Sequence, residues 1–490
     1  MLFNSIEFIY LFLPFTFFIY FFLNEINHNI FSKIFLVFAS LFFYSWWNFL
    51  YLPLILFSII FNYLIGNNIS KVYLDQKGKN KTLLIIGITI NILMLVYFKY
   101  SDFFIVNFNY IFNENIPVLN LSLPLAISFF TFQQIAYLVD CFNKEIENSG
   151  FLNYCIFITF FPQLIAGPIV HHKEIIPQVS STINKNKNYR NISVGIFVFS
   201  IGLFKKIVLA DNFSIWASAG FDNTYSLDFF ESWFTSFSYT FQLYFDFSGY
   251  TDMAIGAALL FNFKLPINFN SPYKSLDIQD FWRRWHITLS RFLKEYIYIP
   301  IGGNKISKYR TYLNLMTVFI IGGIWHGAGW TFILWGFLHG LGIIINRIWK
   351  IFDINLSKFI SWFITFNFIN FSWIFFRANN FGDALNIIKG MIGLNGIFLP
   401  SSIYDNLTFL NKFGINLETS SEKFLSSIKG DFSTLVWLFI GFVIVLFCKN
   451  TMEHISSFKS SLSNLIFNFL ILTCSLFMMN RTSEFLYFNF

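Results

Sequence analysis

The feature that most constrains this chain is the recurrence of apolar stretches, each about 20 residues long, along almost its whole length. A helix of about 20 mostly apolar residues is long enough to cross the hydrocarbon core of a bilayer. The mean hydropathy is +0.58, and 56% of the 490 residues are hydrophobic while only 12% are charged. Water-soluble globular domains do not have this balance. The sequence therefore predicts an all-α polytopic membrane protein whose solvent is the lipid bilayer.

No repeat of fixed period and no low-complexity linker divides the chain. We therefore predict one membrane domain over residues 1–490, with a polar extracytoplasmic loop near residues 379–431. The candidate spans are residues 6–24, 30–47, 48–65, 82–98, 122–140, 150–168, 191–210, 229–247, 313–329, 331–351, 357–376, 433–448 and 464–479.

The positions of the basic residues predict the orientation. No Lys or Arg precedes Lys33, whereas the connection after the third stretch carries Lys71, Lys77, Lys79 and Lys81. Because cytoplasmic loops are enriched in Lys and Arg, we expect the N-terminus outside and the basic segment 264–310 inside. The basic connection 171–190 would then fall outside if every stretch crossed, so at least one upstream stretch is expected not to cross fully.

The net charge of +7 does not indicate nucleic-acid binding, because the Lys and Arg residues lie in short segments between apolar stretches. Four cysteines, in or beside apolar stretches, have neither C-x-x-C nor metal-ligand spacing. A Walker loop, a dinucleotide fingerprint and H-E-x-x-H are absent from the sequence. We therefore expect no metal and no tightly bound cofactor.

The segment 277–299, DIQDFWRRWHITLSRFLKEYIYI, has a helical pattern with His286 near its centre. Its apolar row is Phe281, Trp285, Leu289, Phe292 and Tyr296, and its charged row is Asp280, Arg284, Arg291 and Glu295. This pattern predicts one amphipathic helix lying in the membrane interface.

A second histidine, His326, lies within the apolar run LNLMTVFIIGGIWHGAGW. An ionisable side chain at membrane depth is a functional candidate, and the glycines beside it permit close packing or a break in the helix. An imidazole that burial keeps neutral can take the proton of an alcohol as it attacks a thioester carbonyl. The alternative is that His326 hydrogen-bonds a neighbouring helix while His286 anchors an interfacial one, and His339 allows the same two interpretations.

The remaining histidines, His28, His171, His172 and His454, lie in polar connections, where we expect solvated or interfacial side chains.

Several long runs resemble one known family. They are SFFTFQQIAYLVD (128–140), FFPQLIAGPIV (160–170), QLYFDFSGYTDMAIGAALLFNFKLPINFNSPYKSLDIQDFWRRWHITLSRFLKEYIYIPIGG (242–303), GGIWHGAGWTFILWGFLHG (322–340) and NFSWIFFRA (370–378). These runs resemble the membrane-bound O-acyltransferase family, and within it the alginate O-acetyltransferase-like branch that acetylates bacterial exopolysaccharides. The resemblance extends over most of residues 1–380.

By this resemblance His326 occupies the position of the family's catalytic histidine, and His286 occupies its second signature position. The implied fold is a ring of spanning and tilted helices around a central tunnel, in the bacterial cytoplasmic (inner) membrane. The branch implies acetyl-CoA as donor, a polysaccharide acceptor, and a separate exported acetyltransferase partner of the SGNH-hydrolase-like kind.

The residues that we expect to contact substrate are Trp325, Arg283, Arg284, Trp282, Asn270 and Asp252. The two arginines could attract an anionic, phosphate-bearing donor, or they could contact anionic lipid headgroups. Asn270 and its neighbour Asn268, like Asp252, could line the tunnel or satisfy interrupted helix backbone.

Two other functions remain compatible with the sequence. The same fold could transfer a D-alanyl group toward teichoic acid, or an acyl chain to a lipid or a protein. A transporter or flippase could use polar intramembrane residues and interrupted helices without any chemistry.

Overall fold

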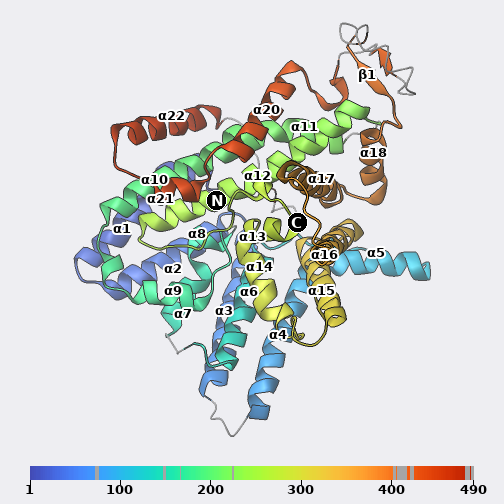
Figure 1. Ribbon diagram of the computed structural model, residues 1–490. Coiled ribbons are helices and arrows are strands. Elements are labelled where there is room, and N and C mark those ends of the chain that lie inside the picture. The colour runs from blue at the N-terminus through green and yellow to red at the C-terminus, as the bar shows by residue number, and fades with distance from the viewer. Residues whose placement is uncertain are drawn as a thin grey trace.

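The computed structural model describes residues 1–71, 77–146, 150–165, 167–222, 226–400, 404, 417–419, 424–479 and 486. Helices form almost all of the regular structure in these ranges, and the described strands are one short parallel pair, β1 (Ile397–Leu399) and β2 (Leu417–Thr419). The helices pack into one body around the long helix α12 (Figure 1). The prediction of an all-α polytopic protein is confirmed.

The main helices follow one another as α1 (Leu13–Glu25), α2 (Asn29–Ser45), α3 (Leu52–Lys71), α4 (Lys77–Lys99), α5 (Ser101–Phe112), α6 (Ile127–Phe142), α7 (Phe151–Thr159), α8 (Phe161–Leu164), α9 (His172–Ser180), α10 (Tyr189–Phe204), α11 (Asp211–Phe221), α12 (Phe229–Leu260), α13 (Ile278–Arg284), α14 (Ile287–Leu293), α15 (Lys308–His326), α16 (Trp330–Trp349), α17 (Lys358–Arg377), α18 (Phe381–Met391), α20 (Phe432–Phe447), α21 (Thr451–Ser456) and α22 (Leu462–Met478). Three π-helical segments continue neighbouring helices: η1 (Glu7–Phe12), η5 (Lys205–Ala210) and η7 (Lys294–Tyr298).

Among the described residues, six helices are long and apolar enough to cross a membrane: Glu7–Glu25, Phe49–Lys71, Asn80–Lys99, Tyr189–Phe221, Trp330–Trp349 and Lys358–Arg377. The apolar helices α2, α6, α20 and α22 are shorter. Nearly every predicted stretch therefore corresponds to a helix, although α12 extends to Leu260, well beyond the expected end at residue 247.

The stretch 150–168 is not one spanning helix. It breaks at Phe160, whose non-helical backbone (φ −48°, ψ 109°) separates α7 from the short α8. The residues on either side of this stretch meet, because the Lys173 ammonium lies 3.3 Å from the Glu145 carboxylate. The chain therefore enters the bundle and returns to the end from which it started. The charge of the connection 171–190 predicts that at least one upstream stretch does not cross fully, and a path that returns in this way is of that kind.

Two reciprocal glycine contacts bring α10 and α12 together at the centre of the molecule. A Cβ atom on Gly202 would lie 2.5 Å from the Gly249 carbonyl, and one on Gly195 would lie 2.8 Å from the Gly256 carbonyl. Gly195 and Gly202 are seven residues apart on α10, and Gly249 and Gly256 are seven residues apart on α12, so both contacts fall on one seam of an antiparallel crossing. This close packing buries α12 almost completely from Ser238 to Leu260.

The segment 277–299 also differs from its prediction, because it does not form one amphipathic helix. Helix α13 ends at Arg284, and His286 adopts a left-handed conformation, with φ of 43°, before α14 begins. The loop before α13 replaces the missing helical hydrogen bonds. The Asn270 amide donates to the Arg284 carbonyl at 2.9 Å, and the Ile287 amide donates to the Asn268 carbonyl at 3.0 Å.

The predicted polar loop near residues 379–431 contains α18 and the pair β1–β2. Residues 401–403, 405–416 and 420–423 of this loop lie outside the described residues.

Candidate active site

The hairpin of α15 and α16 fixes the position of His326. Helix α15 ends at His326, and Gly327 follows in an extended conformation. The two helices approach closely because Gly323 and Gly336 have no side chains at their contact. A Cβ atom on Gly323 would collide with the Phe332 carbonyl, and one on Gly336 would collide with the Phe319 carbonyl. The glycines of the GGIWHGAGW motif thus allow the packing that buries His326, which is only 3% exposed.

Aromatic rings surround the imidazole of His326. The centroids of Trp325, Trp335 and Phe376 lie 4.9, 5.0 and 5.1 Å from its own. Within the described part of the chain, neither the Trp325 nor the Trp335 indole N–H has a hydrogen-bond partner. A buried donor without a partner is costly, so the Trp325 N–H, which lies on the wall of a cavity, suits an oxygen atom of a bound molecule.

His326 lines a cavity of about 440 Å³ between the α2–α3 connection, the end of α4, the start of α6 and the end of α15. Exposed Trp47 and Ser122 lie at its outer part, whereas buried Trp325 and His326 lie at its inner part. The other lining residues are Asn48, Tyr51, Lys99, Leu123, Pro124, Leu125, Ala126, Ile127, Ser128, Phe129 and Ile165. The imidazole is therefore buried but borders a space that a substrate can enter.

Lys99, the last residue of α4, borders the same cavity. Its ammonium donates to the carbonyls of Trp325 at 2.6 Å and His326 at 3.0 Å, and to the Ser128 hydroxyl at 3.4 Å. The two carbonyls belong to the C-terminal end of α15, where a cation interacts favourably with the helix dipole.

His286 is fully buried, and its hydrogen bonds define its tautomer. The side-chain oxygen of Asn268 accepts from the Thr288 amide at 3.2 Å and from the Thr288 hydroxyl at 3.0 Å. Because a backbone amide can only donate, this Asn268 atom is an oxygen, and the His286 Nδ1 that lies 3.1 Å away must carry a hydrogen. In the neutral ring, Nε2 then has the lone pair.

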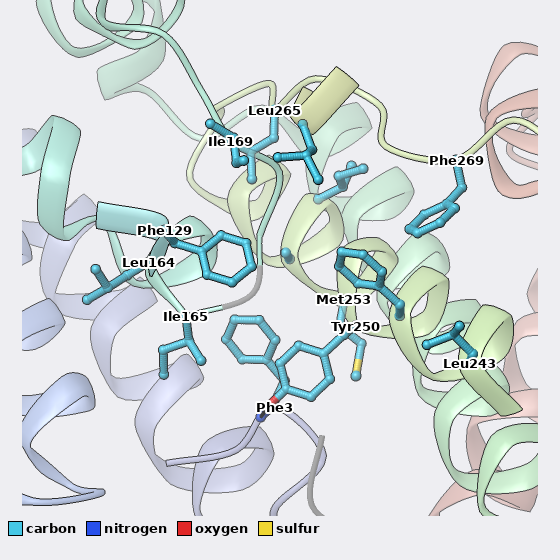
Figure 2. Close-up of a cluster of buried hydrophobic side chains, with 14 of the residues drawn as sticks. Phe3, Phe129, Leu164, Ile165, Ile169, Leu243, Tyr250, Met253, Leu265 and Phe269 are labelled. Carbon is cyan, nitrogen blue, oxygen red and sulfur yellow. Dashed lines mark hydrogen bonds between the residues drawn. The ribbon is translucent and has the colours of Figure 1, made fainter. Parts of the chain in front are cut away.

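The two histidines share a neighbour, because the Trp325 ring lies 4.9 Å from His326 and 6.1 Å from His286. An apolar cluster packs beside them. Figure 2 shows Phe129 and Ile165 on one side of this cluster, and Tyr250 and Met253 of α12 on the other. Phe129 and Ile165 therefore belong both to this apolar cluster and to the wall of the cavity.

His339 has a complete set of partners. Its Nδ1 accepts from the Trp282 indole at 3.2 Å, so Nε2 carries the hydrogen and donates to the Ser372 hydroxyl at 2.9 Å. The Ser372 hydroxyl donates in turn to the Ile369 carbonyl at 2.8 Å. These contacts join α13, α16 and α17 and give His339 the geometry of a structural residue.

Of the expected substrate contacts, only Trp325 lies in the cavity with His326. Trp282 packs on His339, and Arg284 pairs with Asp280 at 3.0 Å. Arg283 is exposed.

Asn270 accepts from the Asn450 side chain at 2.9 Å. Asp252 pairs with Lys205 at 2.7 Å and accepts from the Thr451 hydroxyl at 2.6 Å. Because α12 is continuous there, Asp252 has no interrupted backbone to satisfy.

Two of the remaining histidines are not solvated as expected, because His171 is 1% and His172 4% exposed. Burial, together with the nearby Arg291 charge, lowers the pKa of His171 to about 4. Its Nδ1 lies 3.0 Å from the Tyr296 hydroxyl. His28 is exposed and His454 is half-buried.

Sequence reasoning missed Lys99 and Trp335. A lysine directly after an apolar stretch usually reaches the interface, so its position alone did not suggest an inward-facing ammonium. Trp335 lies nine residues after His326, and only the close α15–α16 hairpin brings the two rings together. The described residues contain no group of three or more His, Cys, Asp or Glu side chains that could hold a metal ion.

Comparison with known proteins gives an independent result. The sequence profile described as MBOAT, membrane-bound O-acyltransferase family, matches residues 41–381. The peptidoglycan O-acetyltransferase of Helicobacter pylori is 48% identical over 529 aligned positions, covering 100% of this chain and 98% of the relative. The probable alginate O-acetylase AlgI of Pseudomonas aeruginosa is 35% identical, covering 84% and 78%. The teichoic acid D-alanyltransferase of Streptococcus thermophilus is 27% identical, covering 52% and 68%.

Proposed function

Because the chain belongs to the membrane-bound O-acyltransferase family, we propose that it transfers acetyl groups from a cytosolic thioester to hydroxyls of an exported cell-surface polysaccharide. It is a multi-pass membrane O-acetyltransferase. The observation that carries the finer proposal is the position of His326, a buried imidazole bordering a cavity whose outer residues are exposed. His326 supplies the base, and the cavity provides space for the hydroxyl group that the base deprotonates.

In the proposed reaction His326 takes the proton of the acceptor hydroxyl as its oxygen attacks the thioester carbonyl carbon. The new carbon–oxygen bond forms, the carbon–sulfur bond breaks, and the imidazolium returns the proton to the leaving thiolate. The indole N–H of Trp325, which borders the cavity and lacks a partner in the described structure, donates to the carbonyl oxygen while it carries negative charge. His286, held with its proton on Nδ1, presents Nε2 as an acceptor beside Trp325.

The two ends of the bundle suit the two substrates. Loops rich in Lys and Arg, including residues 264–310, favour the cytoplasmic side of the bacterial inner membrane, where acetyl-CoA is the donor. The cavity that borders His326 lies at the other end of α4 and α15, which supports acceptor binding from outside and an external N-terminus. We propose an exported acetyltransferase of the SGNH-hydrolase-like kind as a partner on that side.

The relatives favour an acetyl group and a polysaccharide. Two of them are named for peptidoglycan and alginate O-acetylation and are 48% and 35% identical. The relative named for D-alanyl transfer is 27% identical and covers about half of this chain. D-alanyl transfer and acylation of a lipid or protein are therefore secondary proposals.

The test is acetyl transfer by the purified full-length protein in liposomes, with radiolabelled acetyl-CoA and peptidoglycan or alginate oligomers as acceptors. His326→Ala should retain the wild-type melting temperature and lose about 10²–10⁴-fold in kcat. His28→Ala, at an exposed histidine, should transfer normally. A folded His326→Ala protein that acetylates at the wild-type rate would contradict the role of His326. Movement of substrate without any acyl product would favour a transporter.

A further inference from the structure

Lys99, half-buried at the end of α4, differs from the two lysines of η5. Lys205 pairs with Asp252 at 2.7 Å, and Lys206 pairs with Asp246 at 2.6 Å and Asp211 at 2.9 Å. Among the described residues, no carboxylate lies within 4.0 Å of the Lys99 ammonium. The bundle thus neutralises two of its inner cations with aspartates, whereas Lys99 has only neutral partners.

The neutral partners of Lys99 compensate its charge incompletely. The carbonyls of Trp325 and His326 occupy two of its N–H donors, but the third reaches the Ser128 hydroxyl only at 3.4 Å. A half-buried ammonium without a counter-ion is partly desolvated, and an anion that joins it is therefore stabilising. Because Lys99 borders the cavity, such an anion can come from a molecule bound there.

The remaining cavity wall suits a sugar. Trp47 and Trp325 supply aromatic surface, and Asn48, Tyr51 and Ser122 supply polar groups toward the outside. Mostly apolar walls with a few placed polar groups are typical of small-molecule sites. Lys99 bonds to the backbone carbonyl of His326 itself, so an anionic group held by Lys99 lies close to the proposed base.

We propose that Lys99 recognises a carboxylate of the acceptor, so that the enzyme selects acidic polysaccharides whose reacting hydroxyl lies near that carboxylate. This inference rests on the proposed function, and it makes Lys99 a specificity residue that binds the acceptor. A purely structural Lys99, which only ties α4 to the end of α15, would show no preference for acceptor charge.

The experiment measures binding, which does not require catalysis. The ligands are a uronic-acid trisaccharide and its carboxyl-reduced analogue, which retains the original ring hydroxyls but has no negative charge. The purified full-length protein is titrated with each, and quenching of tryptophan fluorescence reports occupancy, since Trp47 and Trp325 border the cavity. The variants are Lys99→Met and Lys99→Arg. Lys305→Met is the control. Lys305 lies just before the start of α15, and His326 lies at the other end of this helix, which is about 27 Å long.

Wild type should bind the acidic trisaccharide at least about tenfold more tightly than its neutral analogue, because a charge-assisted hydrogen bond to a half-buried cation is lost in the analogue. Lys99→Met should remove this difference and leave the Kd of the neutral sugar unchanged. Lys99→Arg and Lys305→Met should preserve the preference. In wild type, raising the salt concentration should weaken binding of the acidic ligand alone.

Equal binding of both sugars by wild type would overturn the proposal, and so would a Lys99→Met protein that weakens both equally. If Lys99→Met does not fold, the proposal is still tested by the difference in wild-type Kd between the acidic and the neutral trisaccharide and by the salt dependence of that difference. Failure of acetyl transfer with intact charge-selective binding would contradict the proposed chemistry but not the role of Lys99.

Discussion

At the scale of single residues, Asn268 fixes the position and the tautomer of the His286 ring. Its side-chain oxygen accepts from His286 Nδ1 and twice from Thr288. The Thr288 hydroxyl also accepts from the Ile169 amide at 3.1 Å. This network anchors the left-handed turn at His286 to the segment that follows α8. The ring is thereby held in one tautomer and one orientation, as the imidazole of a catalytic triad is held by its carboxylate.

We predict that Asn268→Ala lowers kcat by about tenfold or more, because His286 loses the acceptor that fixes its proton on Nδ1. It should also destabilise the protein by about 1–3 kcal/mol, since buried donors of Thr288 and His286 lose their partner. Asn268→Asp keeps an oxygen in place and should retain more activity than Asn268→Ala. The measurements are kcat of acetyl transfer as a function of pH, together with thermal unfolding. Equal activity of Asn268→Ala and wild type would show that His286 needs no fixed tautomer.

At the scale of elements, the contact between α15 and α16 is set by one of the two adjacent glycines in GGIWHG. A Cβ atom on Gly323 would collide with the Phe332 carbonyl, whereas one on Gly322 would meet only the Leu293 side chain, at 3.5 Å. The first contact involves backbone that cannot move without separating the helices. The second is an ordinary van der Waals distance.

Gly323→Ala should therefore push α16 away from α15, lower the melting temperature and reduce acetyl transfer, because Trp335 on α16 contacts His326 on α15. We expect a destabilisation of about 1–3 kcal/mol, the usual cost of overpacking. Gly322→Ala is the matched control and should be neutral or slightly stabilising, since alanine favours a helix. Thermal unfolding and transfer assays on both variants check this. Equal effects at the two positions would contradict the close contact at Gly323.

The elements also show what the sequence could and could not predict. Hydropathy located nearly all the long helices, because a spanning helix needs a continuous apolar stretch whatever it packs against. The break at His286 was not predictable from the 3.6-residue pattern of segment 277–299. It depends on Asn268 and Asn270, which lie in a loop before α13 and bond to the backbone there. At this break, hydrogen bonds to the loop before α13 take the place of the hydrogen bonds of a continuous helix.

The candidate site, like the fold, was predictable only in part. His326, His286 and Trp325 lie in motifs that the sequence alone marked. The proximity of Lys99 to His326 joins residues 227 positions apart and follows only from the packing of α4 against α15.

At the scale of the whole molecule, buried ion pairs join the central helix α12 to the neighbouring segment η5. Its Asp246 and Asp252 pair with Lys206 and Lys205 in η5, where the helix containing α10 widens to a π-helical turn. Buried ion pairs contribute little net stability, but removing one partner leaves a costly isolated charge. These pairs therefore fix the position of α10 and α11 against α12. They also explain why the Asp252 carboxylate serves as a structural partner of Lys205 and does not contact the cavity.

The proposed direction of transfer requires the two ends of the bundle to face opposite compartments, and native cysteines provide a test. Exposed Cys448 lies at the basic end, because its carbonyl accepts from the Lys274 ammonium at 2.8 Å. Exposed Ser122 lies at the outer part of the cavity near His326. Cys141 and Cys155 are buried and should not react.

In a Cys474→Ser background, we predict that a membrane-impermeant maleimide labels Cys448 only in inverted vesicles. In a protein that also carries Ser122→Cys and Cys448→Ser, labelling should occur only in intact, right-side-out cells, because the cavity then opens to the outside. Detergent-solubilised samples of both proteins should label fully, which controls for local reactivity. Labelling of Cys448 from outside would reverse the orientation. Labelling of both sites from one side would contradict the prediction that the two ends of the bundle face opposite compartments. The acceptor and donor would then approach His326 from the same compartment.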